Sequence, residues 1–152
     1  MHEPSTLPVM VIDDEPHLRI TASQTLELAG YTPHCFESAE QALAALPNDF
    51  PGVIVSDIRM PGMDGMALLH ELHSRDATLP IILITGHGDI STAVEAMRAG
   101  AWDFLEKPFA GDQLLDVVRR GIEKRQLSLE NLRLKAELEV QQAALGPRLV
   151  GR

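Results

Sequence analysis

The chain has a single cysteine, few aromatic residues and no long apolar run. Cys35 is the only cysteine among 152 residues, which excludes an internal disulfide, and its neighbours in a presumed strand predict a buried, inert thiol. No stretch approaches the ~20 uninterrupted apolar residues of a membrane span, and residues 1–7 lack the basic start and apolar run of a signal peptide. We therefore expect a cytoplasmic protein with no membrane partner.

Basic residues are also scarce, and their distribution is uneven. Residues 1–111 contain 16 acidic and 5 basic residues, a net charge of −11, whereas residues 112–152 contain 6 acidic and 8 basic residues, a net charge of +2. A surface this acidic repels nucleic acid, and it contains no basic recognition stripe. We expect no direct contact between this chain and DNA.

Short apolar runs alternate with helical patterns, and 45% of the residues are apolar, enough for one full core with an appendage. Regular alternation predicts an α/β fold, a doubly wound parallel sheet built by right-handed crossovers. Pro33 places its strand at a sheet edge, because proline cannot donate to a central ladder. We expect strands at 9–12, 32–36, 53–57, 81–84 and 102–106, and helices at 16–29, 39–46, 64–75, 89–99 and from 112 onward.

Helical spacing predicts which residues face the core. The third helix should bury Leu68, Leu69 and Leu72, and the fourth should bury Val94 and Met97. The first should place Leu18, Ala22, Leu26 and Ala29 on one face. We expect Ser38, Asp64 and Asp89 to begin the second, third and fourth helices.

Polar side chains follow the apolar runs at four predicted strand ends. Ligands of parallel sheets bind outside the carboxyl ends of the strands, so these side chains should meet at one edge. Carboxylates gathered there would raise each other's pKa values unless a cation joined them, and all-oxygen ligands suit Mg²⁺. In chain order the residues are Asp13, Asp14, Asp57, Thr85 and Lys107.

This ordered set resembles the receiver domains of bacterial two-component response regulators, from about Val9 to about Val118. The resemblance implies a five-stranded sheet of order 2-1-3-4-5 with a flavodoxin-like (CheY-like) topology. It also implies a phospho-acceptor switch that catalyses only its own phosphorylation and dephosphorylation. Asp57 would take a phosphoryl group from a sensor histidine kinase.

The same resemblance implies a role for each site residue. Asp14, Asp57 and the backbone carbonyl of Arg59 would bind Mg²⁺ directly, with Asp13 bound through water. Lys107 would neutralise the phosphoryl oxygens and Thr85 would bond one of them, after which the aromatic ring of Phe104 would rotate inward. Arg59 and His87 would flank the path of the attacking water and tune the lifetime of the phospho-aspartate.

Two other classes of protein have to be weighed. A haloacid-dehalogenase-like phosphatase also uses a strand-end aspartate and Mg²⁺, but it needs an acid two residues after the nucleophile, where this chain has Arg59. A phosphorylation-independent interaction domain would lack the acid, the hydroxyl or the lysine, and none is missing. Both alternatives are less favoured than the receiver.

The last predicted helix begins near Asp112 and meets no breaker before Gly146-Pro147. A helix of 34 residues is about 50 Å long, so much of it must leave the domain. Leu127, Asn131, Leu134 and Leu138 form a stripe with spacings of four, three and four, which indicates a two-stranded coiled coil and a homodimer. A solvated helix, or one that docks on another domain, is the alternative.

Finer similarity extends over Asp57–Gly65, Ile84–Ile90 and Glu123–Asn131. These segments resemble the NtrC-type, sigma-54-dependent activators and, among them, the C4-dicarboxylate transport regulators. In that family a linker helix leads into a ring-forming ATPase and then a DNA-binding domain. We therefore expect a receiver core at 1–111, a helix continuing into a coiled-coil linker at 112–145, and the start of an ATPase domain at 146–152. Phosphorylation would change the dimer arrangement to control that ATPase.

Overall fold

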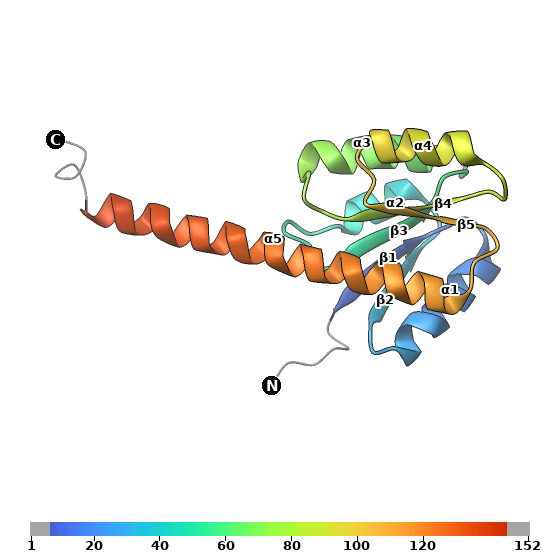
Figure 1. The fold of residues 1–152 in the computed structure, drawn as a ribbon, viewed down its shortest axis with the longest axis horizontal. Helices are drawn as coiled ribbons and strands as arrows, with labels where there is room; N and C mark the ends of the chain where they lie inside the picture. Colours follow the sequence, from blue (N-terminus) through green and yellow to red (C-terminus); the bar gives the residue numbers. More distant parts are fainter. Residues whose placement is uncertain (1–6, 146–152) are drawn as a thin grey trace.

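Five parallel strands form one twisted sheet in the order β2-β1-β3-β4-β5 (Figure 1). The computed structural model describes residues 7–145. The strands are β1 (Pro8–Ile12), β2 (Thr32–Phe36), β3 (Val53–Asp57), β4 (Ile81–Thr85) and β5 (Asp103–Glu106). The helices are α1 (Pro16–Leu28), α2 (Ala39–Ala45), α3 (Gly65–Arg75), α4 (Ile90–Arg98) and α5 (Gly111–Leu145). The predicted doubly wound sheet, its strand order and the edge position of the Pro33 strand are confirmed.

Alternate residues of the central strands supply two separate apolar layers. Met10 and Ile12 of β1 pack with α2, α3 and α4 on one face, and Val9 and Val11 pack with α1 and α5 on the other. Every residue of β3 and β4 is buried, as a parallel sheet covered on both faces requires. The carboxyl ends of the strands are thereby held on a rigid frame.

Two predicted helix starts show the expected side-chain caps. The Ser38 hydroxyl accepts the Gln41 backbone N–H, and the Asp64 carboxylate accepts the Ala67 backbone N–H. Asp89 is the N-cap residue of α4, but its side chain makes no capping hydrogen bond. Leu68, Leu69 and Leu72 of α3 are buried as predicted.

Three expectations about burial are wrong. Val94 and Met97 of α4 are 44% and 41% exposed, because Ala93 and Ala96 occupy the side of the helix that faces the core. Cys35 is exposed, because its strand lies at the edge of the sheet and has a neighbour on one side only. Ala29 is exposed as well, since α1 ends at Leu28 and Ala29 is its C-cap residue.

The long helix α5 packs on the sheet through its first part and then projects far beyond the domain (Figure 1). Gly121 allows the close packing, because a Cβ there would lie 3.0 Å from Val53 Cγ1 and 3.3 Å from Trp102 Nε1. Past Arg125 the helix carries exposed apolar side chains, of which Leu127 is 68% exposed. No helix within residues 7–145 combines the length and the apolar sequence that a membrane span needs.

Candidate functional site

Three carboxylates meet at the carboxyl ends of β1 and β3. One oxygen from each of Asp13, Asp14 and Asp57 can be chosen so that the three lie within 4.8 Å of one another. Asp13 is fully buried and Asp57 is only 7% exposed, whereas Asp14 reaches solvent. The predicted acidic cluster is therefore present, half enclosed by protein and half open to water.

One carboxylate oxygen of Asp13 accepts a hydrogen bond and the other has no hydrogen-bond partner among the described residues. Its Oδ1 accepts the Glu15 backbone N–H at 2.8 Å, and its Oδ2 is buried with no hydrogen-bond partner among the described residues. Burial raises the pKa of Asp13 to about 6; the Glu15 N–H opposes this rise, and the charge of Asp57 adds to it. A buried oxygen beside two further carboxylates fits a hard divalent cation such as Mg²⁺.

Lys107 brings the compensating positive charge. It lies in the loop after β5, and its Nζ is 3.4 Å from Asp57 Oδ2. The lysine side chain is 36% exposed and the aspartate side chain 9% exposed, so this pair is less screened by water than a surface ion pair. The arrangement places an ammonium group beside the central carboxylate.

The backbone at the start of α3 packs closely against the backbone at the end of β3, next to Asp57. A Cβ at Gly65 would lie 2.5 Å from the Asp57 carbonyl oxygen, so only glycine fits this position. The Gly65 N–H donates to the Ile58 carbonyl at 2.8 Å. Backbone contact of this kind fixes the strand end from which the Asp57 side chain projects.

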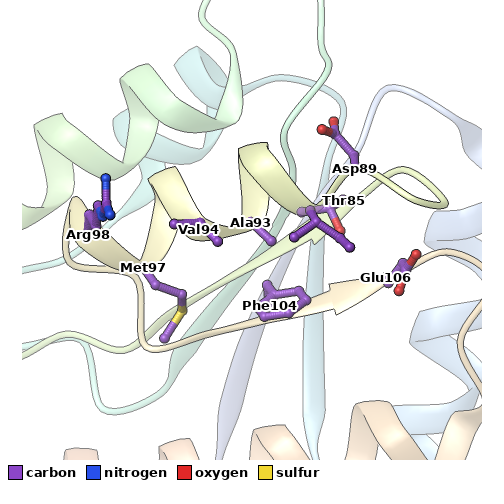
Figure 2. A pocket seen from close by; sticks show the side chains of 9 residues that line it. Thr85, Asp89, Ala93, Val94, Met97, Arg98, Phe104 and Glu106 are labelled. Atoms are coloured by element: carbon purple, nitrogen blue, oxygen red, sulfur yellow. The ribbon is translucent and has the colours of Figure 1, made fainter.

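Thr85 ends β4, and Phe104 lies on the neighbouring strand β5, two residues before that strand ends. Thr85 is 2% exposed, and its hydroxyl donates to the Leu105 carbonyl at 3.4 Å. Phe104 is 37% exposed and lines a hollow of about 400 Å³ between α4 and β5. In Figure 2 Thr85, Asp89 and Glu106 lie at one end of this hollow, and Met97 at the other.

Arg59 and His87 lie on the exposed rim of the site. The Arg59 guanidinium pairs with the Asp89 carboxylate at 3.2 Å, and its side chain is 79% exposed. His87 is 85% exposed, with Nδ1 3.7 Å from the Glu106 carboxylate. Arg59 therefore contacts the loop after β4, and His87 lies within that loop.

Two polar residues with specific contacts were not anticipated. The buried Arg125 side chain donates to the Phe50 carbonyl, the Thr78 hydroxyl and the Asp76 carboxylate, each at 2.8 Å. The Glu106 carboxylate accepts the Gly88 backbone N–H. Spacing could have revealed the arginine, since 118, 122 and 125 fall on one helix face, but no comparable signal marks Glu106.

Replacing Asp13 by asparagine should stabilise the metal-free protein at pH 7. The shift of its pKa from 3.8 to about 6 corresponds to a cost of ionisation in the fold of up to about 3 kcal/mol. We expect a gain of about 1–3 kcal/mol in the free energy of unfolding, measured with urea and EDTA. Because the folded-state pKa is raised, this cost accumulates as pH rises from about 4 to about 6, so the gain should vanish near pH 4.

Asp14→Asn is the matched control for that substitution. Asp14 is exposed to water, so its charge is solvated and the metal-free stability should change by less than about 0.5 kcal/mol. Both variants should bind Mg²⁺ more weakly. A destabilised Asp13→Asn protein at pH 7 would contradict the view of Asp13 as a strained carboxylate held for a cation.

Comparison with known proteins identifies the family. The model of the response regulator receiver domain matches residues 9–119. The chain is 57% identical over 144 residues to the C4-dicarboxylate transport transcriptional regulatory protein DctD of Pseudomonas aeruginosa, covering 95% of this chain and 31% of that protein. It is 39% identical over 140 residues to the transcriptional regulatory protein FixJ of Bradyrhizobium diazoefficiens, covering 92% of this chain and 68% of that protein.

Solved structures agree with these matches. The crystal structure of NtrX from Brucella abortus superposes with a TM-score of 0.75 at 38% identity, covering 84% of this chain and 30% of that chain. The chain thus spans less than a third of DctD and of NtrX. The 45% identity over 114 residues to NtrC of Salmonella typhimurium, the sheet order and the receiver match together show that this chain belongs to the response regulator receiver domain family, as a receiver of the NtrC and DctD type.

Proposed function

We propose that Asp57 is the phosphoryl acceptor of this receiver and that the donor is a phosphohistidine of a cytoplasmic sensor kinase. A carboxylate oxygen of Asp57 attacks phosphorus, the P–N bond breaks, and imidazole leaves with the electron pair. The product is an acyl phosphate. The observation that carries the proposal is the cluster of Asp13, Asp14 and Asp57 with the Lys107 ammonium beside Asp57.

The residues around Asp57 have separate roles in phosphoryl transfer under this proposal. We assign Asp14, Asp57 and the Arg59 carbonyl to direct binding of Mg²⁺, with Asp13 holding it through water. When bound, the ion neutralises charge on the transferring oxygens. The Lys107 ammonium, 3.4 Å from Asp57, is close enough to transfer its contact to a phosphoryl oxygen and orient the group.

Removal of the metal should abolish phosphorylation. With acetyl phosphate as donor and Mg²⁺ present, the intact mass of the native chain should rise by one phosphoryl group. In EDTA we expect the rate to fall at least about 100-fold, because three crowded carboxylates would then repel the donor. Restoring Mg²⁺ after EDTA is the control, and equal rates in both buffers would rule out the assigned metal site.

The response to phosphorylation starts at Thr85 in this proposal. Its hydroxyl leaves the Leu105 carbonyl, now 3.4 Å away, and bonds a phosphoryl oxygen instead. Phe104 then enters the hollow of about 400 Å³ beside α4, which is large enough for an aromatic ring. We assign Arg59 and His87, both exposed on the rim, to tuning the lifetime of the acyl phosphate.

A phosphatase acting on external esters is the less favoured function. It needs a general acid two residues after Asp57, and that position holds Arg59, which pairs with Asp89 on the exposed rim. The receiver instead acts as a switch, turning over only its own phosphoryl group. Similarity to DctD and NtrC supports control of a downstream, sigma-54-dependent ATPase that is followed by a DNA-binding domain.

The domain organisation is part of the same proposal. We place the receiver core at 1–111 and a linker helix at 112–145, and the expected ATPase start at 146–152 lies outside the described residues. Leu127, Leu134 and Leu138 are 68%, 44% and 56% exposed on that helix, and Asn131 lies among them. Such a stripe is the seam of a parallel two-stranded coil, in which the asparagine sets the register. Phosphorylation then changes the arrangement of the two copies.

Breaking the stripe should dissociate the dimer. Leu134→Glu introduces a charge into the seam of both copies, and we expect the dissociation constant to rise at least about 100-fold in sedimentation equilibrium. Gln126→Glu adds the same charge outside the stripe and should leave the dimer intact. A monomeric native chain, or a Leu134→Glu chain that remains dimeric, would remove the coil from the proposal.

A further inference from the structure

The loop from Gly86 to Asp89, which joins β4 to α4, is tied down by polar contacts at several points. The Gly88 backbone N–H donates to Glu106 Oε2 at 2.5 Å. Arg59 pairs with Asp89 at the far end of the loop. The Thr85 hydroxyl, just before the loop, donates to the Leu105 carbonyl of β5. His87 Nδ1, within the loop, also lies 3.7 Å from the same Glu106 oxygen. Three of these four contacts come from β5.

Packing contributes little to the position of this loop. A Cβ placed on Gly86 or Gly88 would meet no heavy atom within 4 Å, chain neighbours aside, so neither glycine is pressed against the rest of the fold. Gly88 has a φ of 77°, a conformation that glycine adopts without strain. A loop with this much free space is held mainly by its few hydrogen bonds, and Glu106 accepts one of them.

Glu106 is also the residue directly before Lys107. At this strand end the Glu106 carboxylate contacts the loop, while the Lys107 ammonium contacts Asp57. A move of Lys107 toward a phosphoryl group on Asp57 therefore acts on the same piece of backbone that carries Glu106. Figure 2 shows the Glu106 carboxylate and Thr85 at the same end of the α4–β5 hollow.

We propose that Glu106 is a positioning residue of the receiver switch, holding the β4–α4 loop in its unphosphorylated place by accepting the Gly88 N–H. The inference rests on the proposed function, because the contacts that Thr85 and Lys107 make with a phosphoryl group on Asp57 are what displaces the loop from this position. The hydrogen bond stabilises the unphosphorylated arrangement only. Its loss therefore shifts the population toward the phosphorylated arrangement, and ligands of that arrangement bind more tightly.

Beryllofluoride with saturating Mg²⁺ imitates the phosphoryl group and is the probe for this test. Glu106→Ala removes the hydrogen bond together with the 3.7 Å contact between His87 Nδ1 and the Glu106 carboxylate. We expect beryllofluoride to bind about 3- to 10-fold more tightly, as one half-exposed hydrogen bond allows. The Thr85 amide resonance of the free variant should move part of the way to its beryllofluoride-bound position. Glu106→Gln keeps an oxygen that can accept the Gly88 N–H, so it should stay within about 2-fold of the native affinity.

The variants separate the hydrogen bond from charge. If Glu106→Gln behaves like Glu106→Ala, removal of negative charge explains the effect and the positioning role of Glu106 is overturned. Glu95→Ala removes an exposed charge from α4, and an equal gain in affinity there would overturn the positioning role for the same reason. Native affinity in Glu106→Ala would also overturn it while leaving the proposed function intact. A native chain that fails to bind beryllofluoride with Mg²⁺ would overturn both.

Discussion

Asp57→Asn should lose phosphorylation completely. With acetyl phosphate and Mg²⁺ the native chain should gain one phosphoryl group, whereas the variant should show at least about 100-fold less incorporation. The amide has no anionic oxygen to attack phosphorus, and it removes one of the three charges that we propose hold the metal. The fold should survive, because asparagine has nearly the same shape and Asp57 is 7% exposed at a strand end. Intact-mass spectrometry measures the result.

Asp49→Asn is the matched control for this loss. Asp49 lies in the loop before β3 with a φ of 55°, a left-handed conformation that asparagine tolerates, and it is exposed. This variant should be labelled at the native rate. Labelling that persists in Asp57→Asn would show that another residue accepts the group and would withdraw the assignment of Asp57.

Arg125→Met should cost about 2–4 kcal/mol of the free energy of unfolding. The guanidinium is fully buried and bonds the Phe50 carbonyl, the Thr78 hydroxyl and the Asp76 carboxylate. Methionine fills much of the space but makes none of these three hydrogen bonds, and the Asp76 carboxylate keeps only those that Thr78 donates to it. Removing one partner of a buried ion pair is strongly destabilising. The expected loss lies slightly below the roughly 3–5 kcal/mol typical of a broken buried ion pair, because the Asp76 side chain is 26% exposed. Urea unfolding followed by circular dichroism measures it.

The loss of unfolding free energy in Arg125→Met should also depend on pH. Burial raises the pKa of Asp76, but hydrogen bonds from Thr78 and Arg125 outweigh this, and the net shift is downward from 3.8. A carboxyl whose pKa is lowered in the folded state contributes stability at pH values above its pKa in the unfolded chain. The difference in unfolding free energy between the native chain and Arg125→Met should therefore narrow as pH falls below about 4. Arg119→Met, on the exposed side of α5, should cost less than about 1 kcal/mol. Equal losses of unfolding free energy for Arg125→Met and Arg119→Met would contradict the view that the three hydrogen bonds of Arg125 stabilise the fold.

The location of the site was predictable because it depends on strand ends. Each apolar run ends in a polar residue at a definite chain position, and parallel strands bring these positions to one edge. Asp13, Asp14 and Asp57 therefore had to meet, and the structure brings them together. The lysine follows the last strand by the same rule and contacts Asp57. Pro33 marked the edge strand through its missing donor.

Features that depend on neighbouring elements were not predictable. The period of α4 allows either Ala93 and Ala96 or Val94 and Met97 to face the core, and apolar size favours the wrong pair. The small pair packs inward because α4 lies close to the sheet, which leaves the larger pair on the rim of the hollow. Arg125 bonds two loops far away in sequence, and only the folded chain brings them together.

Locating the phosphoryl group itself tests the central claim most directly. An acyl phosphate is reduced by borohydride to the alcohol, which marks the acceptor aspartate with a permanent change of mass. The native chain, labelled with acetyl phosphate and Mg²⁺, reduced and digested, should carry this change at Asp57 and at no other aspartate or glutamate. A reduced side chain at Asp13, Asp14 or any other position, with Asp57 unmodified, would contradict the account.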